Sequence, residues 1–574
     1  MFENLRSKVG ELVSAQFGLD LEVVLTRPEA KFGDFSTNVA LQLAGKLENP
    51  PAGGPRAIAE SICEQLVGGD ILSAEVAGPG FINIKLTDAA LIELTKASAV
   101  KTYSGQKVLV EYSDPNPFKP LHAGHLYTTL VGDVIARMVE YAGAEVVRLN
   151  FGGDVGLHAA KSMWAIMRWL DGQPAKLDEV DGSERPKWLG ERYVEGNNAY
   201  EDDESAKSEI IFINKKIYSL YENGAALSSH IVEHSNSTST MVVNIDQFRA
   251  IYDTCREWSY EYFKELYKQL EVSAFDRFIP ESEVTPLGLT TVKEQLAKGV
   301  YAQSGGAVIF EGEKFGLHNR VFINSEGLPT YEAKDVGLSL TKWQDYHFDK
   351  SIIITANEQA QYMQVVIKSI EQFAPEPASR TLHLTHGVVK LQGGVKMSSR
   401  KGNIVTANDI LQSALQASPE ADESTVLAAV KYAFSKSRIG GDIVYDPLES
   451  VATEGNSGPY LQYAHARARS ILSKLTINYQ LSTINPVFQP GERLLVRKIG
   501  EFSEVVELSV RELMPHYICT YLYELAQEFN RFYEQNRVID SDDREELRLW
   551  LVGRYADTLK AGLDLLGIHA PEKM

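Results

Sequence analysis

The chain has 574 residues, 44% of them hydrophobic and 23% charged, which is enough apolar material for roughly three or four domains with cores of their own. No apolar run is long enough to span a membrane, so an integral membrane protein is excluded and no membrane partner is expected. The formal net charge of −20 argues against a nucleic-acid partner on bulk charge alone, but a local basic face can still bind a phosphate backbone, so composition leaves RNA open.

The start of the chain and the cysteines indicate where the protein works. The first twenty residues are amphipathic and carry acidic side chains, unlike a signal or transit peptide. Cys63, Cys255 and Cys519 lie far apart and form no CxxC pair, so neither a disulfide framework nor a structural zinc site is expected. We therefore expect a cytoplasmic protein without a structural metal.

The first hundred residues mix helical periodicity with strands. They end in a turn and an alternating strand at 78–86, and a loose connector follows at 97–107. We predict an α+β domain over residues 1–105, with no catalytic cluster in it.

A strand–helix–strand unit comes next. An apolar strand begins at Val108, a helix opens at the sequence HAGH, and a second strand covers 146–151 before a glycine-rich turn at 152–156. This unit is the building block of a parallel nucleotide-binding sheet. His122 and His125 lie where the first strand gives way to the helix, where free backbone N–H groups favour a phosphate and imidazoles can donate to its oxygens.

The rest of the chain divides by pattern. Residues 172–250 are acidic and only patchily periodic, which indicates an insertion outside the sheet, whereas 300–395 are rich in strands. From about 452 the pattern is helix after helix. We predict a doubly wound, parallel-sheet (Rossmann-like) α/β catalytic domain over 106–450 and an all-α helix bundle over 451–574.

A second candidate for phosphate chemistry is the loop that begins at Lys396, with the sequence KMSSRKGN up to Asn403. Lysines and hydroxyls on a glycine-flanked loop suit the transient clamping of a pyrophosphate leaving group. An ordinary basic surface loop would show the same composition.

HAGH alone is also compatible with a capped helix that has one surface and one buried histidine. The longer run EYSDPNPFKPLHAGHL, however, resembles the HIGH motif of class I aminoacyl-tRNA synthetases in the form found in arginyl-tRNA synthetases. The match includes Glu111, Asn116, Lys119, His122 and His125. The KMSS loop is similar to the KMSKS motif of the same class, in the same chain order.

The resemblance implies ATP, with Mg²⁺, as a substrate. It implies catalytic roles for His122, His125, Lys119, Lys396, Ser398 and Ser399, and ATP contacts by Gly124, His122, His386, Gly387, Met397 and Lys401. Ser399 departs from the family pattern, because it stands where the second lysine of KMSKS usually lies. Lys119 is expected to take over that lysine's part.

A binding site for arginine must supply hydrogen-bond acceptors, because a guanidinium has only hydrogen-bond donors and keeps its positive charge. Residues 328–335 resemble the Y-x-x-x-D element of the arginyl family, with Tyr331 and Asp335 on one face if the segment is helical. By resemblance these two hold the guanidinium. The further arginine contacts that it implies are Asn116, His125, Glu111 and Gln359. An ordinary exposed helix face is the alternative for Tyr331 and Asp335.

Two regions outside the active site are also similar to the family. Residues 33–45 and 75–86 resemble its N-terminal tRNA-contacting domain, where Phe81 and Asn83 would meet a base. Residues 458–467 resemble the opening of its helical anticodon-binding domain, with Tyr460, Gln462 and Arg467 as candidate tRNA contacts.

The resemblance implies a ligase that activates L-arginine as arginyl-adenylate and transfers it to the 3′ end of tRNA(Arg), acting as a monomer. One alternative is another class I synthetase, for example for glutamate or cysteine, which would lack the Tyr331/Asp335 pocket, or a smaller HxGH nucleotidyltransferase. A nucleotidyltransferase would not need the helical C-terminal domain. Another is a tRNA-binding paralogue without activity, which would be expected to lose the HxGH or KMSS chemistry.

Overall fold

The computed structural model of the protein describes residues 2–96, 101–221, 231–235, 240–392, 405–474 and 487–574. Its N-terminal part packs helices on a four-stranded antiparallel sheet with the order β1-β2-β4-β3. The elements are α1 (Phe2–Phe17), β1 (Leu25–Thr26), η1 (Ala30–Phe32), β2 (Phe35–Thr37), α2 (Val39–Ala44), α3 (Gly54–Leu66), β3 (Ile71–Ala77), β4 (Phe81–Leu86) and α4 (Asp88–Lys96).

A five-stranded parallel sheet forms the centre of the molecule, with the order β14-β13-β5-β6-β9. Its strands are β5 (Lys107–Glu111), β6 (Glu145–Gly152), β9 (Arg277–Pro280), β13 (Lys350–Ala356) and β14 (Thr381–His386). The helices between and around them are α5 (Ala123–Tyr141), α10 (Glu281–Ala297), α11 (Tyr331–Tyr346), η4 (Asn357–Gln359), α12 (Ala360–Glu371) and α13 (Pro375–Ser379).

Both faces of this sheet are covered, as β5 shows. Val108 and Val110 belong to a core with α5, whereas Leu109 between them packs with Val284 of α10 and Leu338 of α11 on the opposite face. Strands buried on both faces read as continuous apolar runs, which is why VLV in β5 and SIII in β13 show no polar alternation.

The strand order reverses at β5. The chain runs outward from β5 to β6 and β9 on one side, and from β13 to β14 on the other. A doubly wound sheet opens a crevice at such a switch point, at the carboxyl ends of the two central strands. The ends of β5 and β13 at Glu111 and Ala356 therefore mark the expected site.

A helical unit follows β6. It consists of α6 (Leu157–Leu170), η2 (Pro174–Glu179), α7 (Arg185–Asp202), α8 (Glu204–Ser219), the hairpin β7 (Ile231–Ser235) and β8 (Thr240–Asn244), and α9 (Ile245–Gln269). These helices share their own apolar core. Residues 172–250 add no described strand to the parallel sheet, as predicted, but they are more helical than their patchy pattern indicates.

The remaining elements flank the sheet. A small antiparallel sheet contains β10 (Ala302–Ser304), β11 (Ala307–Phe310) and β12 (Arg320–Ile323), with η3 (Gly312–Phe315) between the last two. Beyond β14 come β15 (Val389–Leu391), α14 (Ala407–Ala417), α15 (Glu423–Ser435), β16 (Ile443–Tyr445) and α16 (Pro447–Ser450).

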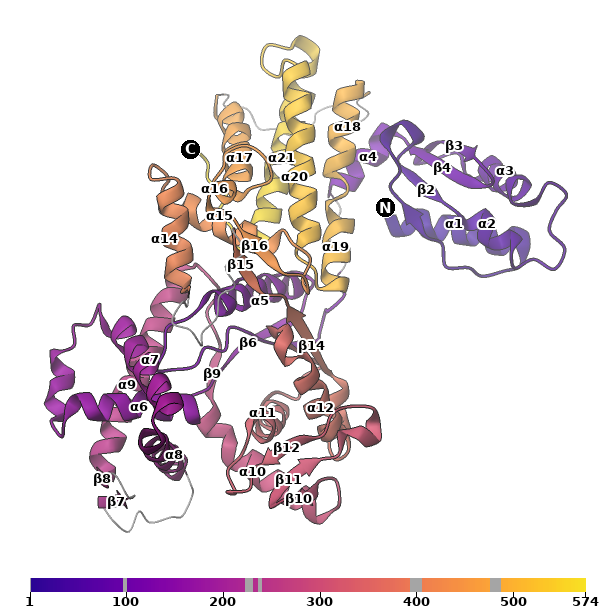
Figure 1. Ribbon diagram of the computed structural model, residues 1–574. Helices are drawn as coiled ribbons and strands as arrows, with labels where there is room; N and C mark the ends of the chain where they lie inside the picture. The colour runs from indigo at the N-terminus through magenta and orange to yellow at the C-terminus, as the bar shows by residue number, and fades with distance from the viewer. Residues whose placement is uncertain (1, 97–100, 222–230, 236–239, 393–404, 475–486) are drawn as a thin grey trace.

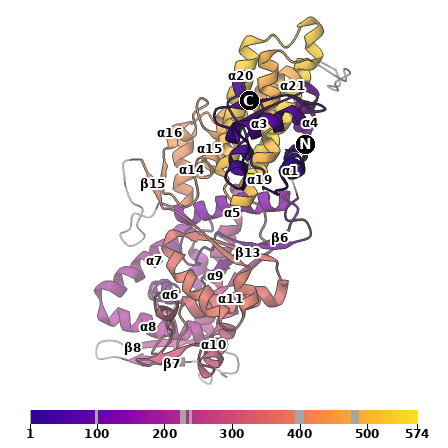
Figure 2. The ribbon, with the colours of Figure 1, turned by 90° about the vertical axis from the view of Figure 1, so that its right-hand side faces the viewer.

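The C-terminal part is a helix bundle of α17 (Gly458–Ser473), α18 (Pro490–Ile499), α19 (Phe502–Glu512), α20 (His516–Gln535), η6 (Asp542–Arg544) and α21 (Glu545–Leu565). It lies on the far side of α5 from α10 and α11, and the N-terminal domain lies beside it near α18 (Figures 1 and 2). Arg493 of α18 joins the two by donating to Asp34 (2.6 Å) and to the carbonyl of Leu86 (2.9 Å).

The predicted architecture is confirmed: a doubly wound parallel sheet, an α+β N-terminal domain and an all-α C-terminal bundle. The domain limits 1–105, 106–450 and 451–574 stay predictions. Among the described residues, no helix is long and apolar enough to cross a membrane.

We predict that Gly288→Ala will disturb the crossing of α10 and α11. An added Cβ at Gly288 would lie 1.9 Å from the carbonyl oxygen of Ala333, so the helices must separate. Overpacking of this kind costs roughly 1–3 kcal/mol or more, and the first unfolding transition in differential scanning calorimetry should move to lower temperature.

Gly553→Ala in α21 is the matched control, because an added Cβ there meets nothing within 4 Å. Alanine also stabilises a helix interior more than glycine does, so this variant should melt at an unchanged or higher temperature. Equal shifts in the two variants would contradict the close helix crossing.

Candidate active site

A cavity of about 410 Å³ opens at the switch point of the sheet. Its wall comes from the turn after β5, the start of α5, the first turns of α10 and α11, the end of β13, and α12. Of the predicted residues it brings together Glu111, Asn116, His122, Gly124, His125, Tyr331, Asp335 and Gln359. Chain segments more than two hundred residues apart therefore meet in one site.

His122 caps α5 with its own side chain. Its Nδ1 accepts hydrogen bonds from the backbone N–H groups of Gly124 (3.1 Å) and His125 (3.3 Å). An added Cβ at Gly124 would lie 3.0 Å from Cε1 of His122, so glycine lets the ring sit over the helix end. The expectation of free backbone N–H groups at this helix end was wrong for Gly124 and His125, because both N–H groups already donate to the imidazole of His122.

The His122 ring is held neutral. Burial, and then the charge of Lys119, lowers its pKa to about 4. Because Nδ1 accepts, the network assigns the ring proton to Nε2, which is left to donate to a ligand. A phosphate at this helix would meet that Nε2–H group.

His125 stacks on His122 with ring centroids 3.7 Å apart and planes 17° apart. Burial lowers its pKa well below the usual value, and His122 adds to the effect. Two charged imidazoles at this separation would repel each other, so neutrality and stacking agree. Nδ1 of His125 is buried and has no partner among the described residues, which leaves it for a ligand.

The turn between β5 and α5 has an unusual backbone. Ser113, Asp114 and Phe118 have φ values of 76°, 46° and 69°. Residues other than glycine rarely adopt this left-handed region of the backbone. Asp114 accepts a hydrogen bond from the backbone N–H of Phe151 (2.7 Å), and this anchors the turn to the end of β6. Such strain persists only where surrounding contacts hold it.

Asn116 lies on the same turn, against the glycine-rich segment. An added Cβ at Gly153 would lie 2.2 Å from Oδ1 of Asn116, so the amide occupies the space that a larger residue would fill. Glycine at 153 therefore allows Asn116 to line the cavity.

Four buried or partly buried carboxylates face the cavity, and two of them pair with lysines. Lys342 donates to Glu111 (2.7 Å), with both side chains at most 3% exposed, and Lys334 donates to Glu281 (2.5 Å). Asp114 and Asp335 are the other two. The lining thus holds more negative than positive charge, which favours a cationic ligand.

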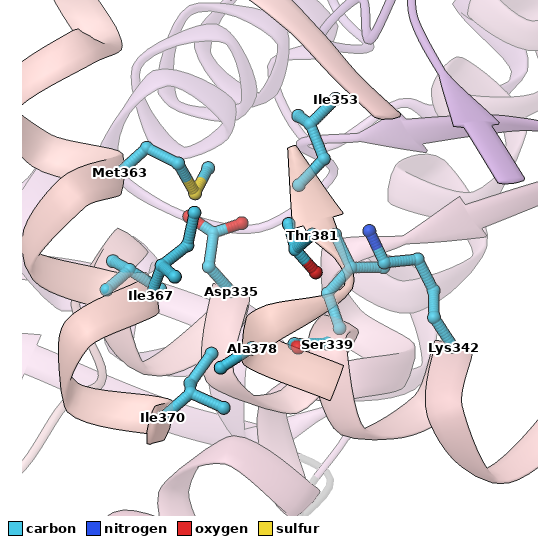
Figure 3. A pocket seen from close by; sticks show the side chains of 11 residues that line it. Asp335, Ser339, Lys342, Ile353, Met363, Ile367, Ile370, Ala378 and Thr381 are labelled. Carbon is cyan, nitrogen blue, oxygen red and sulfur yellow. The ribbon is translucent and has the colours of Figure 1, made fainter. Parts of the chain in front are cut away.

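Asp335 is the carboxylate best placed to receive a cation. Burial raises its pKa well above the usual value, and the charges of Glu111 and Glu281 raise it further. The hydroxyl of Tyr362 donates to it. Behind it lies a small, largely apolar cavity of about 10 Å³, room for about one water, whose walls include Met363 and Ile367 (Figure 3).

Tyr331 and Asp335 both belong to the first turns of α11, so the predicted helical spacing is confirmed. Tyr331 is the first residue of the helix and is 55% exposed, at the open side of the site. Nζ of Lys334 lies 4.6 Å from the centroid of its ring.

Three predicted ATP or catalytic residues lie outside the cavity lining. His386 is buried at the end of β14, where Nδ1 donates to the carbonyl of Gly387 (2.8 Å) and Nε2 lies 2.7 Å from Oγ1 of Thr128. An added Cβ at Gly387 would meet the carbonyl oxygen of Gly441 at 2.2 Å. Lys119 is partly buried, and burial lowers its pKa to about 8.

Five predicted residues, Lys396, Met397, Ser398, Ser399 and Lys401, lie outside the described residues. The chain that follows them runs beside the HAGH turn. Ala123 donates its N–H to the carbonyl of Val405 (3.0 Å), and Ala407 donates to that of Leu121 (2.9 Å). Val405 and Ala407 are thereby fixed beside the start of α5.

The predicted tRNA contacts in the N-terminal domain lie on the outer face of β4. The strand alternates between exposed and buried residues, and Phe81 is 42% exposed. Asn83 lies two residues further along the same face.

The three candidates on α17 differ in position. The hydroxyl of Tyr460 accepts from Asn530 (2.9 Å), and the guanidinium of Arg467 lies 4.6 Å from the ring of Tyr533. Gln462 is 1% exposed, and its amide donates to the carbonyl of His569 (2.9 Å). The expectation of a tRNA contact at Gln462 is therefore corrected, because this face of α17 holds the C-terminal tail.

Reasoning from the sequence missed Asp114, Glu281, Lys334, Lys342 and Tyr362. Glu281 had a usable signal, since it directly follows the apolar strand β9 and so lies at the carboxyl edge of the sheet. Lys342 and Tyr362 had none, because they meet Glu111 and Asp335 through the packing of distant segments. Among the described residues, no group of three or more His, Cys, Asp or Glu side chains is placed to hold a metal ion.

Comparison with known proteins decides the family. The model for the catalytic domain of class I tRNA synthetases (R) matches residues 87–431, which is more than half of the chain. The chain belongs to this arginyl-tRNA synthetase family. Models for the arginyl-tRNA synthetase N-terminal domain and the DALR anticodon-binding domain match residues 3–86 and 461–574.

Relatives cover the chain almost completely. An arginine–tRNA ligase of Porphyromonas gingivalis is 28% identical over 612 residues, with full coverage of both chains. One of Bdellovibrio bacteriovorus is 29% identical and covers 96% of this chain and 94% of its own. The solved arginyl-tRNA synthetase of Thermus thermophilus has a TM-score of 0.77 at 24% identity, with both chains fully covered. That structural likeness shows that the arginyl-tRNA synthetase fold extends over the whole chain.

We predict that Lys342→Met will destabilise the protein strongly. Removal of the ammonium leaves Glu111 buried without its partner, and breaking a buried pair costs roughly 3–5 kcal/mol. The first unfolding transition should move to clearly lower temperature in scanning calorimetry.

Lys560→Met supplies the control, because it removes an ion pair with Asp564 (2.6 Å) whose side chains are 51% and 54% exposed. Exposed pairs contribute about 0–1 kcal/mol, so this variant should melt close to the parent protein. If Lys342→Met melted at the same temperature as the parent, the buried carboxylate of Glu111 would not need the ammonium of Lys342 for stability.

Proposed function

We propose that the protein is an arginine–tRNA ligase, which activates L-arginine with ATP and transfers it to the 3′ end of tRNA(Arg), releasing AMP and pyrophosphate. The observation that carries this proposal is the cavity itself. It places the HAGH turn, with its neutral imidazoles, beside an excess of buried carboxylates centred on Asp335. One end suits phosphate and the other suits a cation.

In the first step the carboxylate of arginine attacks the α-phosphorus of ATP. A carboxyl–phosphate bond forms, and the bond to pyrophosphate breaks. Mg²⁺ accompanies ATP as part of the substrate. Nε2–H of His122 donates to a phosphate oxygen, and the ammonium of Lys119 offsets the charge that collects on the phosphates. Positioning and electrostatics suffice, so no covalent enzyme intermediate is formed.

The remaining predicted residues complete the phosphate side. Gly124 lets the backbone of α5 approach ATP, and the backbone at His386 and Gly387 packs against the adenine. Lys396, Met397, Ser398, Ser399 and Lys401 clamp the pyrophosphate. The anchoring of residues 405–407 beside the HAGH turn supports this role for the preceding loop.

Arginine lies with its guanidinium toward α11. Asp335 accepts from the guanidinium, oriented by the hydroxyl of Tyr362, and Tyr331 closes the open side. Asn116, His125 and Gln359 receive the amino acid's backbone groups. Glu111, paired with Lys342, lies close by in the lining of the cavity. Lysine would be rejected, since its ammonium cannot match the planar pairing of a guanidinium with a carboxylate.

In the second step the terminal ribose 2′-OH of the tRNA attacks the arginyl carbonyl, and AMP leaves. Phe81 and Asn83 contact the tRNA from the N-terminal domain, and Tyr460 and Arg467 contact it from α17. The enzyme acts as a monomer in the cytoplasm. The three cysteines, which are buried free thiols, suit a reducing compartment.

We expect ATP–pyrophosphate exchange with arginine alone among the twenty amino acids, and only when tRNA is present, as the family resemblance implies. The measurement is isotope exchange into ATP, with and without matched total tRNA. Exchange with another amino acid would favour a different class I synthetase. No exchange at all would favour a tRNA-binding paralogue.

We predict that Asp335→Asn will raise KM for arginine by about 10- to 100-fold. The substitution removes a charge-assisted hydrogen bond worth roughly 1.5–3 kcal/mol. KM is measured from the dependence of exchange on arginine concentration.

Asp345→Asn is the control on the same helix, since Asp345 pairs with Arg277 at the surface (2.5 Å). It should change KM by less than about twofold. An unchanged KM in Asp335→Asn would place the guanidinium elsewhere.

A further inference from the structure

Helix α7, in the acidic segment 172–250, crosses the turn that leads into the HAGH sequence. An added Cβ at Gly190 would lie 3.0 Å from Cδ of Pro120, so the helix and the turn are in close contact. One turn further along the same face, the ring of Tyr193 lies under Lys119, with Nζ 5.3 Å from the ring centroid. The contact brings a helix of the insertion to a residue of the proposed active site.

The backbone before Lys119 needs support. Phe118 has a φ of 69°, and its N–H donates to Oγ of Ser259 in α9 (2.9 Å). The ring of Phe118 also packs against Tyr252 of α9, with centroids 5.3 Å apart. Helix α9 thus holds residue 118, and α7 holds the two residues that follow it.

The Lys119 side chain has a long, flexible stem. Its ammonium can act on the phosphates from a fixed position only if other residues restrict the motion of that stem. An aromatic face within about 6 Å of an ammonium attracts it and covers it from water. Burial lowers the pKa of Lys119 to about 8, against the opposing charge of Glu281 on α10. His122 and His125, which also interact with Lys119, are neutral rings.

We propose that Tyr193 is a positioning residue for catalysis: its ring holds the ammonium of Lys119 beside the HAGH turn, so that the charge is in place when ATP binds. The inference deepens the proposed function and rests on it, because it takes Lys119 to stabilise the phosphates. It gives the acidic insertion a role that its composition does not reveal.

A double-mutant cycle in the full-length enzyme tests the proposal, with tRNA and saturating arginine. The four proteins are the parent, Tyr193→Leu, Lys119→Met and the double variant, and the readout is kcat for ATP–pyrophosphate exchange. We expect Tyr193→Leu to lower kcat by about tenfold in the parent, in line with a partly buried cation–π contact. In the Lys119→Met background the same change should cost less than about twofold.

The corners of the cycle separate the two proposals. Arginine-dependent exchange by the parent reports on the proposed function, and a lower but measurable kcat in Lys119→Met reports on the lysine. The effect of Tyr193→Leu in the parent, compared with its effect in the Lys119→Met background, reports on Tyr193. Independent losses that multiply would show that Tyr193 acts without Lys119 and would overturn the inference, as would a Lys119→Met protein with the same kcat as the parent.

Two further variants exclude a general effect on folding. Tyr193→Phe keeps the ring and should retain activity within about threefold, whereas a loss as large as that of Tyr193→Leu would assign the effect to the hydroxyl and reject the ring. Tyr200→Leu makes the same change on the same helix, where the ring lies 4.2 Å from Nζ of Lys161. It should leave kcat nearly unchanged, and an equal loss there would overturn the assignment of the effect to the contact between Tyr193 and Lys119.

Discussion

A carboxylate buried at the end of a strand loses its hydration, and a cation or hydrogen-bond donors must replace it. The centre of this protein is organised around that requirement. Lys342 reaches from α11 to Glu111 at the end of β5, and Lys334 reaches from the same helix to Glu281 after β9. One helix therefore neutralises carboxylates at the carboxyl ends of two strands, which fixes α11 against the sheet.

The same helix carries Asp335, whose charge no lysine neutralises at hydrogen-bond distance among the described residues. Its position depends on how closely α11 approaches α10. Gly288 and Gly337 allow that approach, because an added Cβ at either would lie about 2 Å from a carbonyl oxygen of the other helix. Packing and chemistry are coupled here, since the glycines that bring the helices together also set where the acidic end of the cavity lies.

Local patterns predicted much of this molecule. The strand–helix–strand unit, the histidines at its turn and the spacing of Tyr331 and Asp335 are encoded within short segments, so the order of the amino acids is enough to predict them. The partners of those residues are not predictable in this way, because Glu111 meets Lys342 across 231 positions of the chain. The capping of α5 by His122 was missed for another reason: a side chain of the motif took the N–H groups that were assigned to a ligand.

Charge across the cavity gives the proposed substrate one orientation. Near α11 the carboxylates outnumber the lysines that pair with them, whereas the HAGH end has neutral donors and the ammonium of Lys119 nearby. A zwitterion with a cationic side chain gains by pointing that side chain toward Asp335, and this leaves its carboxylate at the HAGH turn, where the attack on phosphorus must occur. Selection of the amino acid and its alignment for reaction then follow from the same distribution of charge.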